Sequence, residues 1–155
     1  MPNPEKGTWD HAHAWIDEQV LVNDSVYLYY GGYARGHKVN RLEERQIGLA
    51  IMKRDRYVGH QAFQEVGTIT TPLLILKANS MTVNADAKEG WVRVQICNDS
   101  GRPLPGFAFE DCIPISEDGL DLPVRWAQPL EQLKETPVRL EFQLKNSTLY
   151  AFSTE

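Results

Sequence analysis

Apolar and polar residues alternate strictly in the stretch VRLEFQL, residues 138–144. Successive side chains of a β-strand point to opposite faces of a sheet, so this period of two indicates a strand with one face in a core and the other toward solvent. The side chains expected to point inward are Val138, Leu140, Phe142 and Leu144. The stretch therefore predicts a half-buried strand near the C-terminus.

The same alternation recurs earlier in the chain. Val92, Val94 and Ile96 alternate with polar residues in one run, and Met81, Val83 and Ala85 form another. Clusters of turn-forming residues separate the runs, among them KANS, AKEG, NDSGRPLPG, SEDG and KNST. Several short strands with such spacing predict an all-β fold, which we expect to be an antiparallel β-sandwich.

One segment has the pattern of a short helix. In QPLEQLKE, residues 128–135, Pro129 stands at a plausible first-turn position, and Leu130 and Leu133 fall on one face. The sequence predicts about two helical turns here. We expect this helix to be a connector over a sheet edge.

At 155 residues the chain has the size of one domain, but its pattern changes near residues 54–57. Before this point, the expected strands 25–30 and 46–52 are apolar on both faces, as in strands that are covered on both sides. We therefore divide the chain into an N-terminal β-segment, 1–56, and one compact β-sandwich, 57–155. The expected faces of the first part are Val26, Leu28, Ile47, Leu49 and Ile51 on one side and Tyr27, Tyr29 and Met52 on the other.

Charge and composition exclude several classes of partner. The net charge is -5 and the basic residues are scattered, which argues against binding to nucleic acid. No apolar run approaches the ~18 residues of a membrane span, so no membrane association is expected. The N-terminus, MPNPEKGTWD, resembles no signal or transit peptide, and a cytoplasmic location is expected. Without an export signal, Cys97 and Cys112 are expected to be free thiols, although one disulfide is the alternative.

The stretch YLYYGGYARGHK, residues 27–38, has two interpretations. It is either a buried strand that ends at Gly31 and Gly32, or a strand followed by an exposed ligand-binding loop. In the second case Tyr33 would stack against a sugar ring, while Arg35 and His37 would supply hydrogen bonds. Aromatic residues lie in a core more often than on a binding surface, which favours the first interpretation.

Two further groups of residues carry side chains that could bind a metal or take part in catalysis. In WDHAHAWID, residues 9–17, an extended segment would place His11 and His13 on one side with Asp10 and Asp17 nearby, a set that could hold a transition metal. The spacing matches no established metal site, so neither a metal nor another cofactor is expected. In FEDC, residues 109–112, the adjacent carboxylates would point to opposite faces of a strand and could not flank one glycosidic bond. We therefore expect FEDC to be a surface turn that enters a strand.

The order of several short motifs resembles the C-terminal part of bacterial proteins similar to glycoside hydrolase family 32, the invertase and levanase group. DSVYLYYGGYARGH and RQIGLAIMKRDRYVG are similar to the last blade of the five-bladed propeller of that family. GTITTPLLIL, the run from MTVNADA to PGFAFEDC, and PVRLEFQLKNSTLYAF resemble the β-sandwich that follows it. The likeness spans about residues 24 to 152, nearly the whole chain, and none of these motifs is catalytic.

The resemblance implies a function without catalysis. In that family the earlier blades supply the nucleophile, the stabilising aspartate and the acid/base glutamate, and this chain does not contain those blades. We expect a non-catalytic module with a structural role or weak recognition of carbohydrate through Tyr33, Arg35 and His37. A small hydrolase using Asp10, His11, His13 and the 33–37 loop is one alternative, and a protein-binding module is another.

The two-sided apolar pattern of strands 25–30 and 46–52 also predicts self-association. A short β-segment has too little chain to cover both of its faces, and soluble monomers rarely expose a contiguous apolar patch. We therefore expect a homodimer that is joined through the N-terminal segment.

Overall fold

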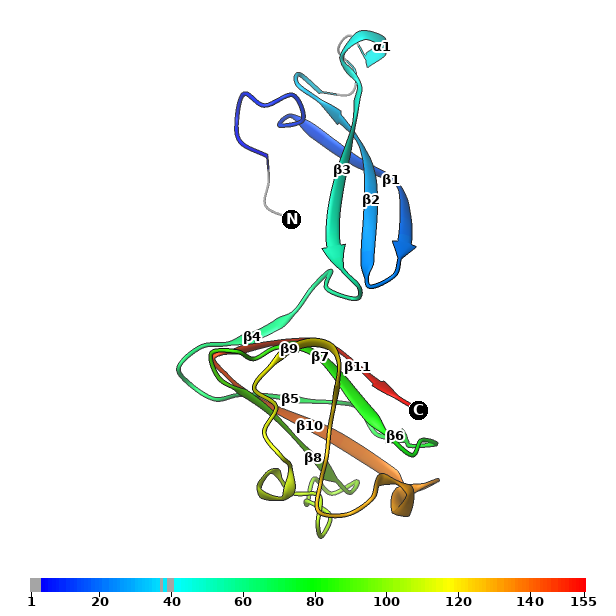
Figure 1. Ribbon diagram of the computed structural model, residues 1–155, viewed down its shortest axis with the longest axis vertical. Coiled ribbons are helices and arrows are strands. Elements are labelled where there is room, and N and C mark those ends of the chain that lie inside the picture. Colours follow the sequence, from blue (N-terminus) through cyan, green and yellow to red (C-terminus); the bar gives the residue numbers. More distant parts are fainter. Residues whose placement is uncertain (1–3, 37, 39–40) are drawn as a thin grey trace. The chain divides into compact units, whose positions relative to one another are not determined.

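The computed structural model describes residues 4–36, 38 and 41–155. It forms two compact units with a boundary between Arg54 and Asp55, which we call the N-terminal sheet unit and the sandwich unit (Figure 1). Antiparallel strands dominate both units, so the predicted all-β class is confirmed. The predicted division, after Arg56, lies close to this boundary but assigns Arg56 to the N-terminal part. Within the described residues, no helix is long and apolar enough to cross a membrane.

The N-terminal sheet unit is a three-stranded antiparallel meander in the order β1-β2-β3. Its strands are β1 (His13–Val22), β2 (Ser25–Tyr33) and β3 (Gln46–Lys53), and a four-residue helical turn, α1 (Arg41–Glu44), precedes β3. β1 carries a bulge between Ile16 and Glu18. The extra residue reverses the alternation of side chains, so Trp15 and Val20, which differ in parity, lie on the same face.

The sandwich unit has two four-stranded sheets. In the first, β10 (Pro137–Lys145) pairs with β8 (Trp91–Cys97) on one side and with β5 (Gly67–Thr70) and β6 (Leu74–Ile75) on the other. In the second, the order is β4 (His60–Ala62), β11 (Ser147–Thr154), β7 (Met81–Asp86) and β9 (Asp118–Pro123). Asn146, with a left-handed φ of 43°, turns the chain from β10 in one sheet to β11 in the other.

The core of the sandwich unit lies between these sheets and contains the side chains that the alternation placed inward. Val138, Leu140, Phe142 and Leu144 of β10 are buried, as are the predicted inward residues of β7 and β8. β10 contributes four of these side chains because it lies inside its sheet, with partner strands along both edges. Alternation therefore located both the strands and their core face correctly.

The helix predicted over residues 128–135 is wrong in type and length. Residues Leu130–Leu133 form a single 3-10 turn, η2, in which the N–H of Lys134 donates to the carbonyl of Glu131. Pro129 supplies no side-chain cap, and Glu135 adopts a left-handed φ of 61° that ends the turn. Leu130 and Leu133 are both buried in the core. Their spacing therefore indicated two buried side chains but not an α-helix.

The predicted faces of β2 and β3 are also wrong. Tyr27 lies opposite Ile51 and Tyr29 opposite Leu49, whereas Val26 lies opposite Met52. Residues directly opposite each other in a sheet point to the same face, so Ile47, Leu49 and Ile51 share a face with the tyrosines and not with Val26 and Leu28. Which residues of β2 and β3 share a face depends on the register between the two strands, and the sequence of one strand does not determine it.

Candidate functional site

The predicted sugar-binding residues do not form an exposed aromatic loop. Tyr33 is the last residue of β2 and is only 9% exposed, and its ring lies 5.8 Å from the ring of His13. Placing Tyr33 on a loop was therefore wrong. Arg35 follows the strand, has an exposed side chain and pairs with Glu44. His37 lies outside the described residues.

The strand extends further than predicted because Gly31 and Gly32 remain in the ladder, opposite Ile47 and Gln46. Their lack of a side chain serves close packing and not a turn. A Cβ on Gly32 would lie 2.3 Å from the ring of Trp9. Trp9 stacks on Tyr30 at 5.8 Å, so the segment before β1 packs against this end of the sheet.

Asp10, His11 and His13 do not converge on one site. The buried carboxylate of Asp10 accepts hydrogen bonds from the hydroxyls of Tyr30, at 2.8 Å, and Thr8, at 2.9 Å. His11 lies at a bend, with Nδ1 2.8 Å from the carbonyl of Thr8, and the predicted extended segment begins only at His13. The ring of His13 packs against Trp15 and Tyr33. Among the described residues, no three His, Cys, Asp or Glu side chains are grouped to hold a metal.

The hydrogen bond from Tyr30 lowers the pKa of Asp10 and, reciprocally, raises the pKa of Tyr30. A lowered carboxyl pKa means that the ionised form is the one stabilised by folding. This contribution is present at neutral pH and is lost as the pH falls below about 4, where an ordinary aspartate is protonated. Asp10 thus anchors the segment before β1 to the sheet.

We expect Tyr30→Phe to raise the pKa of Asp10 toward its ordinary value, because the phenol that donates to the carboxylate is lost. A ¹³C NMR titration of the Asp10 carboxyl group measures this change. Tyr29→Phe is the matched control, since Tyr29 points to the other face of β2 and should leave that pKa unchanged. An unaltered Asp10 titration in Tyr30→Phe would contradict the assignment.

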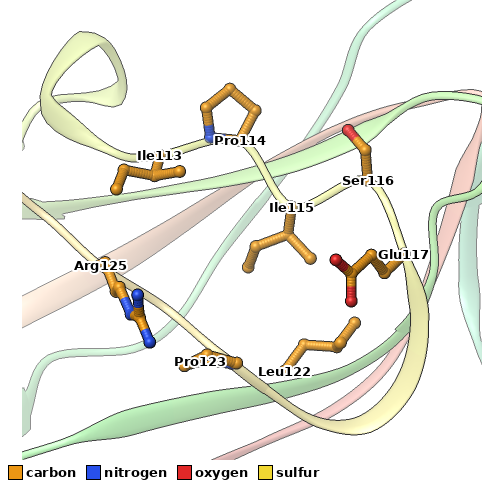
Figure 2. Close-up of a pocket in the computed structure, with 8 residues that line it drawn as sticks. All are labelled: Ile113, Pro114, Ile115, Ser116, Glu117, Leu122, Pro123 and Arg125. Carbon is orange, nitrogen blue, oxygen red and sulfur yellow. The ribbon is translucent and has the colours of Figure 1, made fainter.

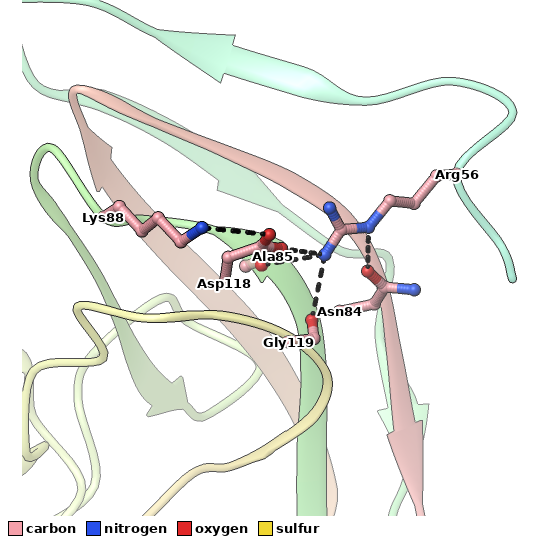
Figure 3. A network of polar contacts seen from close by, with 6 residues as sticks. All are labelled: Arg56, Asn84, Ala85, Lys88, Asp118 and Gly119. Atoms are coloured by element: carbon pink, nitrogen blue, oxygen red, sulfur yellow. Dashed lines mark hydrogen bonds and ion pairs between the residues drawn. The ribbon is translucent and has the colours of Figure 1, made fainter. Parts of the chain in front are cut away.

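Arg56 forms the densest polar network of the sandwich unit (Figure 3). Its Nη2 donates to Asp118 Oδ1 at 2.6 Å and to the carbonyls of Ala85 and Gly119, both at 3.2 Å. Its Nε donates to Asn84 Oδ1 at 2.8 Å, and the guanidinium lies 4.6 Å from the centre of the Tyr150 ring. The guanidinium thus links the first two residues of β9 to β7 and β11, and in doing so stabilises the fold.

Lys88 lies 3.6 Å from the same Asp118 carboxylate, but its side chain is exposed. Local sequence patterns did not predict this network. The only signal for it is the short basic run MKRDR, residues 52–56, at the point where the chain enters the sandwich unit. The partner of Arg56 is 62 residues away, a separation that no local pattern covers.

A pocket of about 300 Å³ lies between the segment 113–117 and the end of β9 (Figure 2). Its walls are mostly apolar, and Figure 2 shows Ile115 between the side chains of Arg125 and Glu117. Ligand pockets typically combine apolar walls with a few polar groups, and this one is at the small end of their usual size range. Backbone hydrogen bonds between Ile115 and Val92, both 2.9 Å, hold the segment in place.

Cys97 and Cys112 are both free and buried. Burial is the main cause that raises the pKa of both thiols above the ordinary value. The backbone N–H of Val94 donates to Cys112 Sγ at 3.3 Å. A buried thiol with a raised pKa is a poor nucleophile, so neither cysteine has the environment of a reactive residue.

The FEDC segment is a surface turn, in agreement with the prediction. Phe109–Asp111 form a single 3-10 turn, and the Asp111 carboxylate accepts a hydrogen bond from the Ala108 N–H at 3.1 Å. Asp111 thus caps its own turn, whereas Glu110 is exposed.

Comparison of the chain with protein-family models, curated proteins and solved structures finds no match. The resemblance to the family 32 glycosidases is therefore a prediction that the sequence motifs alone carry.

Proposed function

We propose that the chain is a non-catalytic β-sandwich module with a structural role, related to the C-terminal region of family 32-like glycosidases. The observation that supports this is that several aspartate side chains are hydrogen-bonded to groups within the fold. Asp10 binds Tyr30 and Asp111 caps a turn, so two of the candidate carboxylates have partners within the fold, and Asp118 is likewise bound by Arg56.

The alternative of a small hydrolase has less support. Such an enzyme would need the Asp10 carboxylate and a histidine to face one substrate, with a proton acceptor within about 3 Å of the reacting group. Here Asp10 is turned toward Tyr30 and His13 packs between two aromatic rings.

Weak ligand recognition is a second candidate function, and the pocket beside β9 favours it. The apolar floor could accept the C–H face of a sugar, while the Ser116 hydroxyl, Glu117 and Arg125 could exchange hydrogen bonds with its hydroxyl groups. The predicted site at Tyr33, Arg35 and His37 is the competing location. Covering of the Tyr33 ring by His13 weakens that site, since stacking requires an exposed ring face.

One NMR experiment tests both functions. The protein is incubated with sucrose and with inulin or levan oligosaccharides at millimolar concentration. We expect no new reducing-end signals from the sugars, and any amide shifts of the protein should be small and gathered in residues 113–125. Sugar hydrolysis that disappears in Asp10→Asn would overturn the non-catalytic proposal, and shifts confined to residues 30–36 would move recognition back to the Tyr33 site.

A further inference from the structure

One face of the N-terminal sheet carries mostly apolar side chains on all three strands. The register places Val20, Tyr27 and Ile51 in one cross-strand row, and Trp15, Gly31 and Ile47 in another. The row between them contains Glu18, Tyr29 and Leu49. We call this surface the apolar sheet face; its members are Trp15, Val20, Tyr27, Tyr29, Ile47, Leu49 and Ile51.

The apolar sheet face is strongly exposed. Ile47 is 77% exposed, and Trp15 and Ile51 are each exposed over more than half of their surface. The seven side chains together leave on the order of 700 Å² accessible, above the ~300–600 Å² of the largest apolar patch on a typical monomer. This is close to the ~800 Å² that each partner buries in a stable protein interface.

The unit has little else to stabilise it. Its buried apolar side chains are few, chiefly Val26 and Leu28 on the opposite face and Tyr33 at the end of β2. A three-stranded sheet reaches independent stability only when its hydrophobic face is covered. We therefore infer that the apolar sheet face is buried in solution.

We propose that the occupant is a second copy of this chain, and that the apolar sheet face is the two-fold interface of a homodimer. The size of the face supports this choice, because it is close to what each partner of a stable dimer buries. Its charges are Glu18 in one row and the Arg45–Asp17 ion pair beside Gly31 in another. A closed two-fold contact needs only one patch that fits itself, so a second copy covers this face without any other partner. The inference is independent of whether the chain is catalytic.

The cross-strand rows indicate how two copies would meet. A two-fold axis parallel to β2 lays β1 of each copy over β3 of the other, in the face-to-face packing of sheets about 10 Å apart. Trp15 then faces Ile47 of the second copy, and the Arg45–Asp17 ion pair lies over Gly31 in the middle of that row. The two Glu18 side chains lie at opposite edges of the interface, where they stay in contact with water and far from each other.

The test is the mass of the full-length protein by light scattering at tens of micromolar, with a matched pair of variants. We expect the wild type to have twice the 17.6 kDa mass of one chain. Ile47→Lys should reduce the mass two-fold, because it places a charge against Trp15 of the second copy. Ile16→Lys makes the same change on the same sheet, at a side chain that is 56% exposed on the opposite face, and should remain dimeric.

A wild-type mass of one chain, or a mass that is not a multiple of one chain because another protein co-purifies, would overturn the proposal. So would a dimer that Ile47→Lys leaves intact, or one that both variants dissociate, because the interface would then lie elsewhere. Circular dichroism establishes that each variant is folded. If Ile47→Lys fails to fold, Ile51→Lys on the same face replaces it, with the same expected two-fold loss of mass.

Discussion

Phe142→Ala is expected to lower the free energy of unfolding of the sandwich unit by about 3–5 kcal/mol. Phe142 is 1% exposed and lies in β10, between Ile69 of β5 and Val94 of β8. Its ring is 5.2 Å from the ring of Phe152 in the opposing sheet, so it joins the two layers of the core. Truncation removes the apolar burial and leaves a cavity that paired strands on both sides cannot close.

Urea titration followed through the amide signals of β8 and β10 measures this loss in the sandwich unit alone. Phe63→Ala is the matched control, since the side chain of Phe63 is 70% exposed in the same unit. We expect the control to change stability by less than about 0.5 kcal/mol, as exposed substitutions usually do. Equal losses in the two variants would mean that Phe142 does not link the layers as described.

Arg56→Met is expected to cost about 3 kcal/mol, the second largest effect. Arg56 and Asp118 form an ion pair at 2.6 Å with both side chains nearly buried. Methionine fills much of the same volume but leaves the Asp118 carboxylate without its charge-assisted hydrogen bond and the carbonyls of Ala85 and Gly119 without their donor. A buried group that loses its partner keeps its full desolvation penalty, which is why the loss exceeds that of a surface pair.

Arg56→Lys separates charge from geometry. Lysine restores the positive charge but cannot donate in the planar fork that reaches Asn84 and Asp118 together, so we expect it to recover less than half of the loss. Arg102→Met is the control, because the exposed side chain of Arg102 makes no ion pair with any residue the structure describes. If Arg56→Met unfolds at the same urea concentration as Arg102→Met, the network does not stabilise the sandwich.

The sequence by itself determined the fold class and the core of the sandwich unit. Apolar and polar residues alternate without interruption over 138–144. Because successive side chains of a strand point to opposite faces, this pattern predicts both the strand and its buried face. The surface turn at Glu110 and Asp111 was likewise predicted correctly from local patterning.

Local patterning failed where its period was broken or its meaning was ambiguous. The bulge in β1 reverses the alternation after Ile16, so no single period of two runs from His13 to Val22. The glycines after Tyr30 looked like a turn but are ladder residues that admit Trp9. Leu130 and Leu133 fit a helix equally well as they fit one buried 3-10 turn.

Only the tertiary structure decided which residues meet. The register of β2 against β3 put Ile47, Leu49 and Ile51 beside the tyrosines, and thereby gathered the exposed apolar side chains on one face. Arg56 pairs with Asp118, which is 62 residues away in the chain, and the segment 113–117 lies beside β9 and forms the pocket with it. The physical reason is that alternation depends on neighbours in the chain, whereas register and long-range pairing depend on how separate strands maximise burial and hydrogen bonding together.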